Sequence, residues 1–122
     1  MNTALVLLGS NVDTEKNISV ANEILALSFG IEKSSSLEFS MPVGDQYKSP
    51  FANKAVKLTT HLTQKETVEL FKSIETKMGR TAESKINGII PIDIDLIFWN
   101  DNLEHDDYHK FDFIKKCIDQ LI

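Results

Sequence analysis

Two aspartates separated by a single residue are the side chains best suited to do chemistry. Asp93 and Asp95 lie within residues 91–99, where polar and apolar side chains alternate. A period of two predicts a β-strand, so both carboxylates should lie on one face, together with Ile97 and Trp99. The opposite face should carry four apolar side chains, those of Ile92, Ile94, Leu96 and Phe98.

Paired carboxylates on one strand face need compensation, because like charges at neighbouring positions repel and Asp is a poor strand residue. A divalent cation would supply it. Two aspartates offer only oxygen ligands, which suit Mg²⁺, an ion that keeps several waters and takes further ligands from substrate phosphates. The alternative is an acidic strand face that simply meets water. The Asp-x-Asp motif is short and does not by itself decide between these interpretations.

The elements that must position this strand begin with an apolar run, residues 4–8, which predicts a central strand. Gly9-Ser10-Asn11 follows it and predicts a turn. The next segment has apolar residues at helical spacing, with Asp13 or Thr14 as its cap. Gly30 is expected to end this helix.

A strand is predicted over residues 31–40, and a second, longer one over residues 51–62, where the alternating pattern resumes. Between them, residues 41–50 hold two prolines and a glycine and must form a loop. Loops of this length in a compact domain are often functional, because they can cover a ligand while the sheet fixes their ends.

Thr63, with Glu66 three residues later, forms a capping-box pattern that predicts the start of a second helix, which Gly79 should end. Residues 81–90 have no useful periodicity and are expected to be an irregular connection. A last helix would be capped by Asp106 or Asp107. Its apolar stripe consists of Phe111, Ile114, Ile118, Leu121 and Ile122.

The predicted order of elements is strand, helix, strand, strand, helix, strand, helix. This βαββαβ pattern with a C-terminal helix predicts an α+β fold, a ferredoxin-like antiparallel sheet with helices packed on it. A length of 122 residues is the size of one compact domain, so we expect a single domain over residues 1–122.

Composition narrows the range of partners. A formal net charge of −5 argues against a surface that binds nucleic acid or anionic membranes, since such surfaces need clustered Lys and Arg. Cys117 is the only cysteine, which fits a reducing compartment. The apolar run at residues 4–8 is too short for a signal peptide, so we expect a cytoplasmic protein. Arg80 is the only arginine, which is few for an enzyme that handles phosphates.

Five short motifs, taken in order and at similar spacing, resemble the hydroxymethyl-dihydropterin pyrophosphokinase family. They are residues 4–11, 42–44, 51–56, 74–80 and 92–96. Members of that family transfer a pyrophosphoryl group from ATP to a pterin alcohol in folate biosynthesis. The resemblance implies that ATP and the pterin alcohol are the small-molecule partners here. No Gly-x-x-x-x-Gly-Lys loop is present, so side chains and metal ions would have to hold the nucleotide.

The resemblance also assigns roles to individual residues. Asp93 and Asp95 would hold two Mg²⁺ ions that bridge the ATP phosphates, with Arg80 beside them as a third catalytic residue. The residues expected to bind the pterin are Ser40, Val43, Phe51, Asn53 and Phe113. The residues expected to bind the nucleotide are Glu75, Leu96, His105 and Lys85.

Several positions depart from the family pattern. Ile90 stands where a phosphate-binding arginine is expected, and Ala82 and Phe111 replace two further basic residues. Loss of one charge-stabilising donor can lower a rate by about a hundredfold. Two alternatives to a Mg-dependent pyrophosphokinase therefore stay open. One is a degenerate, non-catalytic relative that binds a pterin or nucleotide, and the other is a ferredoxin-like interaction domain.

Overall fold

The computed structural model describes residues 1–42, 44, 47 and 49–122. At its centre, β1 (Asn2–Ser10) pairs antiparallel with β4 (Phe51–Thr60) on one side and with β5 (Asp93–Trp99) on the other. Beyond β4 lie β2 (Gly30–Ser34) and β3 (Glu38–Ser40), and beyond β5 lies the short β6 (Asn102–Leu103). The strand order β2-β4-β1-β5-β6 confirms the predicted α+β fold with an antiparallel sheet.

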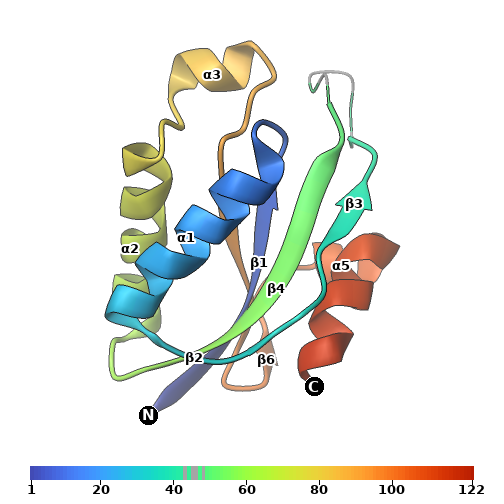
Figure 1. Ribbon diagram of the computed structural model, residues 1–122. Helices are drawn as coiled ribbons and strands as arrows, with labels where there is room; N and C mark the ends of the chain where they lie inside the picture. Colours follow the sequence, from blue (N-terminus) through green and yellow to red (C-terminus); the bar gives the residue numbers. More distant parts are fainter. Residues whose placement is uncertain (43, 45–46, 48) are drawn as a thin grey trace.

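Helices cover both faces of this sheet (Figure 1). One face carries α1 (Thr14–Ser28) and α2 (Gln64–Lys77). The other carries α4 (Asp107–Lys110), α5 (Asp112–Ile118) and a closing turn of 3₁₀-helix, Asp119–Leu121. A short helix, α3 (Ala82–Ile86), leads from α2 towards β5. The C-terminal addition thus turns a two-layer sandwich into three layers.

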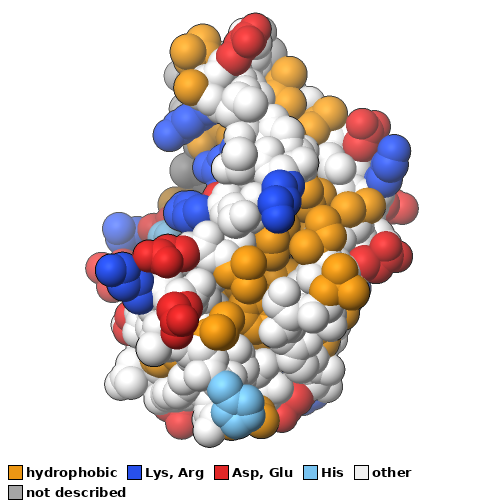
Figure 2. All heavy atoms as spheres, turned by 90° about the vertical axis from the view of Figure 1, so that its left-hand side faces the viewer, with side chains coloured by type: hydrophobic (Ala, Val, Ile, Leu, Met, Phe, Trp, Pro, Cys, Tyr) orange, Lys and Arg blue, Asp and Glu red, His pale blue; other side chains and the backbone are white. Residues whose placement is uncertain are grey.

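Each face of the sheet has its own apolar core. The larger one lies under α1 and α2 and takes Val6 and Leu8 from β1, whereas Leu7 between them faces the core under α5. A strand that is buried on both faces has a continuous apolar sequence, and residues 4–8 have this pattern. Figure 2 shows a band of apolar side chains across the layer of α1 and α2. Partly buried side chains from α1, from α2 and from the residue that follows α2 pack on the core: Ile24, Leu70 and Met78.

Local signals placed the ends of α2 correctly. The Thr63 hydroxyl accepts a hydrogen bond from the Glu66 amide at 3.2 Å, and the Glu66 carboxylate accepts one from the Thr63 amide at 3.0 Å. This is the predicted capping box. Gly79 follows the helix with a φ of 98°, the left-handed conformation that glycine adopts without strain. Asp13 is the N-cap residue of α1, but its side chain makes no capping hydrogen bond.

One predicted strand and one predicted connection were wrong in detail. Residues 31–40 form two strands instead of one, because the Ser35 hydroxyl accepts the hydrogen bond of the Ala55 amide at 2.8 Å and interrupts the ladder between backbones. Residues 81–90 are not irregular throughout, because Thr81 and Ser84 form a capping box that starts α3.

The last helix was predicted as one element and is two. Phe111 has extended dihedral angles, φ −125° and ψ 119°, and separates α4 from α5. Within the apolar stripe that was predicted, Ile122 is exposed, whereas Ile114, Ile118 and Leu121 are buried against the sheet. The break matters for the site below, because it changes which side chains of this segment face the sheet.

The alternation of β5 reverses near its end. Leu5 of β1 pairs with Phe98 and Val6 pairs with Leu96, so Ile97 is an extra residue, a β-bulge. Beyond it Phe98 joins the core under α5 and Trp99 joins the core under α1 and α2. The predicted faces of Phe98 and Trp99 were therefore wrong. Asp93 and Asp95 precede the bulge and share the α5 face of the sheet, as predicted.

Among the described residues, none of the helices combines the length and the apolar character that a crossing of the membrane requires.

Candidate active site

A cavity of about 380 Å³ lies on the α5 face of the sheet, between the sheet and the C-terminal helices. Asp93 and Asp95 line it. The other lining residues come from β1, β3, β4, the following helices and the loop before β4: Leu7, Gly9, Ser40, Met41, Tyr47, Phe51, Asn53, Asp107, Lys110, Phe111, Phe113 and Ile114. Strands thus supply the floor, and the C-terminal segment supplies one wall.

Strand register brings the floor residues together. Gly9 of β1 pairs with Asn53 of β4 and with Asp93 of β5, so the three lie in one row across the sheet. A Cβ atom at Gly9 would lie 3.6 Å from Asn53 Oδ1 and 3.8 Å from a ring carbon of Phe51. A glycine here therefore leaves open the space between the β4 side chains and the carboxylates of β5.

The segment that leads into β5 is held by Asn11, the last residue of the Gly-Ser-Asn motif. Its side-chain amide donates to the Gly88 carbonyl at 2.8 Å, and its Oδ1 accepts from the Ile90 amide at 2.6 Å. Both Asn11 and Ile90 are buried. This motif therefore sets where the aspartate strand begins, which the sequence pattern alone did not reveal.

On the β4 side of the cavity, Asn53 is held in one orientation. Its side chain is only 3% exposed, and Nδ2 donates to Ser40 Oγ at 2.8 Å and to the Glu38 carbonyl at 3.2 Å. Oδ1 lies on the side of Gly9. The Phe51 ring packs edge-on against Tyr47, with ring centroids 5.2 Å apart. An amide oxygen beside aromatic rings suits a flat, polar-edged ligand.

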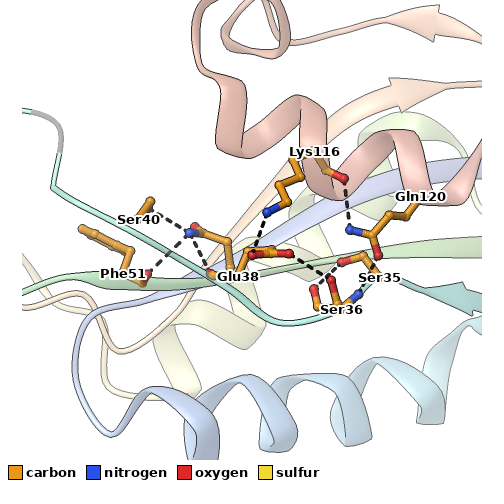
Figure 3. A network of polar contacts seen from close by, with 8 residues as sticks. Ser35, Ser36, Glu38, Ser40, Phe51, Lys116 and Gln120 are labelled. Carbon is orange, nitrogen blue, oxygen red and sulfur yellow. Dashed lines mark hydrogen bonds and ion pairs between the residues drawn. The ribbon is translucent and has the colours of Figure 1, made fainter.

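The opposite wall is tied to the same strands by a network of polar contacts (Figure 3). Lys116 Nζ of α5 lies 3.3 Å from Glu38 Oε2, and the Ser36 amide donates to Gln120 Oε1 at 2.9 Å. These contacts fix α5 to β3, and the 3₁₀ turn that follows α5 to the segment before β3. They thereby set the distance between Phe51 on the sheet and Phe113 on α5.

Behind the carboxylates, the half-buried Arg80 pairs with the buried Glu75. Arg80 Nη1 lies 2.6 Å from Asp93 Oδ1 and 3.0 Å from Glu75 Oε2. The same Glu75 oxygen accepts a hydrogen bond from the Ile94 amide at 2.8 Å. Burial raises the pKa of Glu75, against the opposing effects of the Ile94 amide and the Arg80 charge. The pair therefore ties α2 to the strand between the two aspartates.

The two aspartates have opposite protonation tendencies. Burial and the charge of Asp93 raise the pKa of Asp95 to about 8. Burial would also raise the pKa of Asp93, but hydrogen bonds from Asp95 and Arg80 outweigh it and hold this pKa below its ordinary value. At neutral pH Asp95 is therefore mostly protonated, and a bound cation would favour the ionised form of both carboxylates and so lower the pKa of Asp95.

The donor set suits a hydrated magnesium ion. In the part of the chain that the structure describes, no group of three or more His, Cys, Asp or Glu side chains could hold a metal ion. Two carboxylates leave most coordination positions to water and substrate oxygens, which is how Mg²⁺ is commonly bound. Zn²⁺ sites in proteins usually have three or four protein ligands.

The structure brings together most of the residues that the sequence singled out. Six line the cavity: Ser40, Phe51, Asn53, Asp93, Asp95 and Phe113. Glu75 and Arg80 lie directly behind them. Leu96 packs on the core under α1 and α2, and neither His105 nor Lys85 is among the lining residues. Val43 lies outside the described residues.

Sequence reasoning missed part of the lining. Alternation along β1 could have placed Leu7 and Gly9 on one face, and Tyr47 lies in the loop that was expected to be functional. No sequence pattern predicted that Asp107 and Lys110 line the cavity, because their position there depends on the break at Phe111.

A larger hollow of about 520 Å³ lies elsewhere along the sheet, lined by residues that include Leu5, Lys57 and Phe98. Its described lining residues include no pair of carboxylates and no buried amide. Chemistry therefore favours the smaller cavity as the functional site, although size alone would not.

A small-molecule site with an aromatic and amide side and an acidic side is thus built into an α+β sandwich. The family model described as 7,8-dihydro-6-hydroxymethylpterin-pyrophosphokinase (HPPK) matches residues 5–122, and the chain belongs to this family.

Two curated proteins are similar to the chain. One is the 2-amino-4-hydroxy-6-hydroxymethyldihydropteridine pyrophosphokinase of Bacillus subtilis (strain 168), 35% identical over 107 residues, which are 84% of this chain and 64% of that protein. The other is the bifunctional protein FolKE of Lactococcus lactis subsp. lactis (strain IL1403), 34% identical over 105 residues, 83% of this chain and 30% of that protein. The chain thus spans less than two thirds of the length of both relatives.

Proposed function

We propose that this chain catalyses the reaction of its family, the transfer of a pyrophosphoryl group from ATP to 6-hydroxymethyl-dihydropterin in folate biosynthesis. One observation carries the proposal. The paired carboxylates, Asp93 and Asp95, line the same cavity as the aromatic and amide residues that suit a pterin. We further expect the protein in the cytoplasm, where the thiol of Cys117 stays reduced.

The pterin would lie over the β4 end of the cavity. Phe51 on the sheet and Phe113 on α5 offer their rings to its flat faces. Asn53 Nδ2 is occupied by Ser40 and Glu38, so its Oδ1 is the atom available to accept a hydrogen bond from the N–H groups at the pterin edge. Binding of the pterin by Val43, which the family resemblance implies, stays a prediction.

The triphosphate would lie over the β5 end of the cavity. Asp93 and Asp95 would hold two Mg²⁺ ions, which neutralise phosphate charge and align the reacting oxygens. Glu75 fixes Arg80 and the Ile94 amide, and so keeps the two aspartates in place. The hydroxyl oxygen of the pterin alcohol forms a bond to the β-phosphorus of ATP, and the hydroxyl proton is released to water. The bond from that phosphorus to the oxygen of the α-phosphate breaks, and AMP leaves.

Three further contacts to the nucleotide stay predictions. Leu96, His105 and Lys85 were assigned to the nucleotide by resemblance, and none lines the cavity. Binding of ATP could extend beyond the cavity to reach them. Substitutions at Asp93 or Asp95 are therefore the more direct test of the site.

The test measures release of AMP from ATP with Mg²⁺, with and without the pterin alcohol. Three proteins are compared: wild type, Asp95→Ala, and the control Glu23→Ala, which removes an exposed acidic side chain of α1. We expect release that depends on the pterin in wild type and control, and a loss of about a hundredfold or more in Asp95→Ala.

Equal release by wild type and Asp95→Ala would refute the role of the carboxylate pair. If the folded wild type released no AMP, the chain would not be a pyrophosphokinase on its own. Calorimetric binding of the pterin without turnover would then support the non-catalytic alternative, which the replacements at Ala82, Ile90 and Phe111 motivate.

A further inference from the structure

The charges that line the active-site cavity are unbalanced. Asp93, Asp95 and Asp107 contribute three carboxylates, and Lys110 is the one basic side chain among its described lining residues. A cavity that accepts a triphosphate needs cationic groups besides metal ions, because several phosphate oxygens carry charge at once. Among the described lining residues, Lys110 is therefore the side chain that can supply such a cationic group.

Arg80 is poorly placed to serve as the phosphate-binding cation. The same nitrogen, Nη1, contacts both Asp93 and Glu75, at 2.6 and 3.0 Å. Glu75 is only 4% exposed, and if Arg80 moved away its remaining ion-pair partner would be the exposed amine of Lys72, 3.7 Å from Glu75 Oε1. We conclude that Arg80 mainly neutralises carboxylates of the protein and is not itself among the residues that line the cavity.

Lys110, in contrast, is held loosely. Its side chain is 64% exposed, and its amine lies 3.9 Å from Asp107 Oδ1, one turn earlier in the same short helix. Exposed ion pairs of this kind contribute at most about 1 kcal/mol, so leaving Asp107 costs little. A flexible four-carbon stem can then carry the amine towards a ligand in the cavity.

The break at Phe111 explains how Lys110 comes to line the cavity. Lys110 ends α4, and Phe111 has the extended conformation that separates α4 from α5. Both side chains line the cavity, although they are adjacent in sequence. Phe111 is the position where a basic residue was expected from the family pattern. A positive charge is present one residue earlier, on the side chain of Lys110.

We propose that Lys110 binds a phosphate group of the nucleotide in this cavity and supplies the charge that Phe111 does not. This inference rests on the proposed function, because it requires a phosphate-bearing substrate. Lysine acts as a point charge and lacks the planar fork of arginine, so Lys110 contributes attraction more than orientation.

The test compares wild type with Lys110→Ala and Lys110→Arg, and with the control Lys16→Ala, which removes an exposed lysine of α1. Two measurements are made: steady-state release of AMP, and calorimetric binding of the Mg²⁺ complex of α,β-methylene ATP, which is not turned over. We expect Lys110→Ala to lower kcat/KM for ATP by about tenfold to a hundredfold and to leave KM for the pterin unchanged. Lys110→Arg should restore most of the loss, which a purely structural role would not predict.

Failure of the inference can be told apart from failure of the proposed function. If wild type releases AMP and Lys110→Ala stays within about twofold of Lys16→Ala in turnover and analogue affinity, the role of Lys110 is refuted and the function stands. If wild type binds the analogue without releasing AMP, the function fails, and weaker binding by Lys110→Ala alone still supports the inference. If wild type neither binds the analogue nor releases AMP, both are refuted.

Discussion

The two faces of β5 make opposite demands on the protein. Towards α1 and α2, Ile92 and Ile94 are buried in a closed apolar core. Each methyl group removed from water there adds to the free energy of unfolding. Towards α5, Asp93 and Asp95 face a cavity. Burial and the charge of Asp93 raise the pKa of Asp95, whereas hydrogen bonds from Asp95 and Arg80 hold the pKa of Asp93 low against the effect of burial. One face therefore stabilises the fold, and the other costs stability in order to present carboxylates to a ligand.

The difference follows from how far the C-terminal helices reach. Further along the strand, Ile97 and Phe98 are covered by the core under α5, on the same face as the aspartates. Towards the start of β5 the C-terminal helices cover less of this face of the sheet. There, aromatic side chains from the C-terminal segment form a wall of the cavity. Substitutions on the two faces should accordingly separate stability from ligand binding.

The largest change in stability is expected on the apolar face. Ile94 is 3% exposed and lies between the two aspartates in sequence. Ile94→Ala should lower the free energy of unfolding by about 3 kcal/mol, through lost burial and the cavity that remains. Urea denaturation in EDTA measures it, with Ile94→Val as a matched control that should lose about 1 kcal/mol. A loss below that of the control would mean that this face is not closely packed.

A smaller change, of opposite sign, is expected one residue later. Because the pKa of Asp95 is raised to about 8 in the folded protein, its protonated form is favoured there, while the unfolded chain ionises near the ordinary value of Asp. Its contribution is absent at pH below the unfolded value and becomes unfavourable as pH rises towards 8. Asp95→Asn removes this cost and should stabilise the metal-free protein at pH 7 by about 1 to 2 kcal/mol, less than the full shift implies, because the site is partly open to solvent.

The same variant should respond differently to magnesium. Ligands that bind only the folded state raise its stability, so Mg²⁺ with an ATP analogue should stabilise wild type more than Asp95→Asn. Thermal unfolding with and without Mg²⁺ measures both effects. A variant that is less stable than wild type in EDTA at pH 7 would contradict the raised pKa of Asp95 in the folded protein.

The sequence predicted the fold well where local signals are strong. The capping box at Thr63, the glycine at position 79 and the alternation around Asp93 and Asp95 all depend on nearby residues, and all are present in the structure. Ser35 and the bulge at Ile97 were missed, because a side chain that replaces a backbone partner and an extra residue in a ladder depend on the neighbouring strand.

The candidate site was predictable only in part. Residues carried by strands, such as Phe51 and Asn53, came with the resemblance and line the cavity. Lys110 did not, since its approach to the cavity depends on an extended residue at position 111 that no local pattern signals. The wall formed by the C-terminal segment was therefore the least predictable part of the site.

The smallest change in stability is expected where that wall is fixed to the sheet. Lys116 Nζ lies 3.3 Å from Glu38 Oε2, but the lysine side chain is 66% exposed. Exposed ion pairs are screened by water and salt, so Lys116→Ala should lower the free energy of unfolding by about 0.5 kcal/mol. Because this contact helps set the distance between Phe113 and Phe51, affinity for the pterin should fall more than stability does. Calorimetry measures the affinity for the pterin, and urea denaturation measures the free energy of unfolding. The control is Lys33→Ala, which removes an exposed lysine of β2. Equal effects on both quantities would mean that the contact contributes to the fold alone and does not position the wall of the cavity.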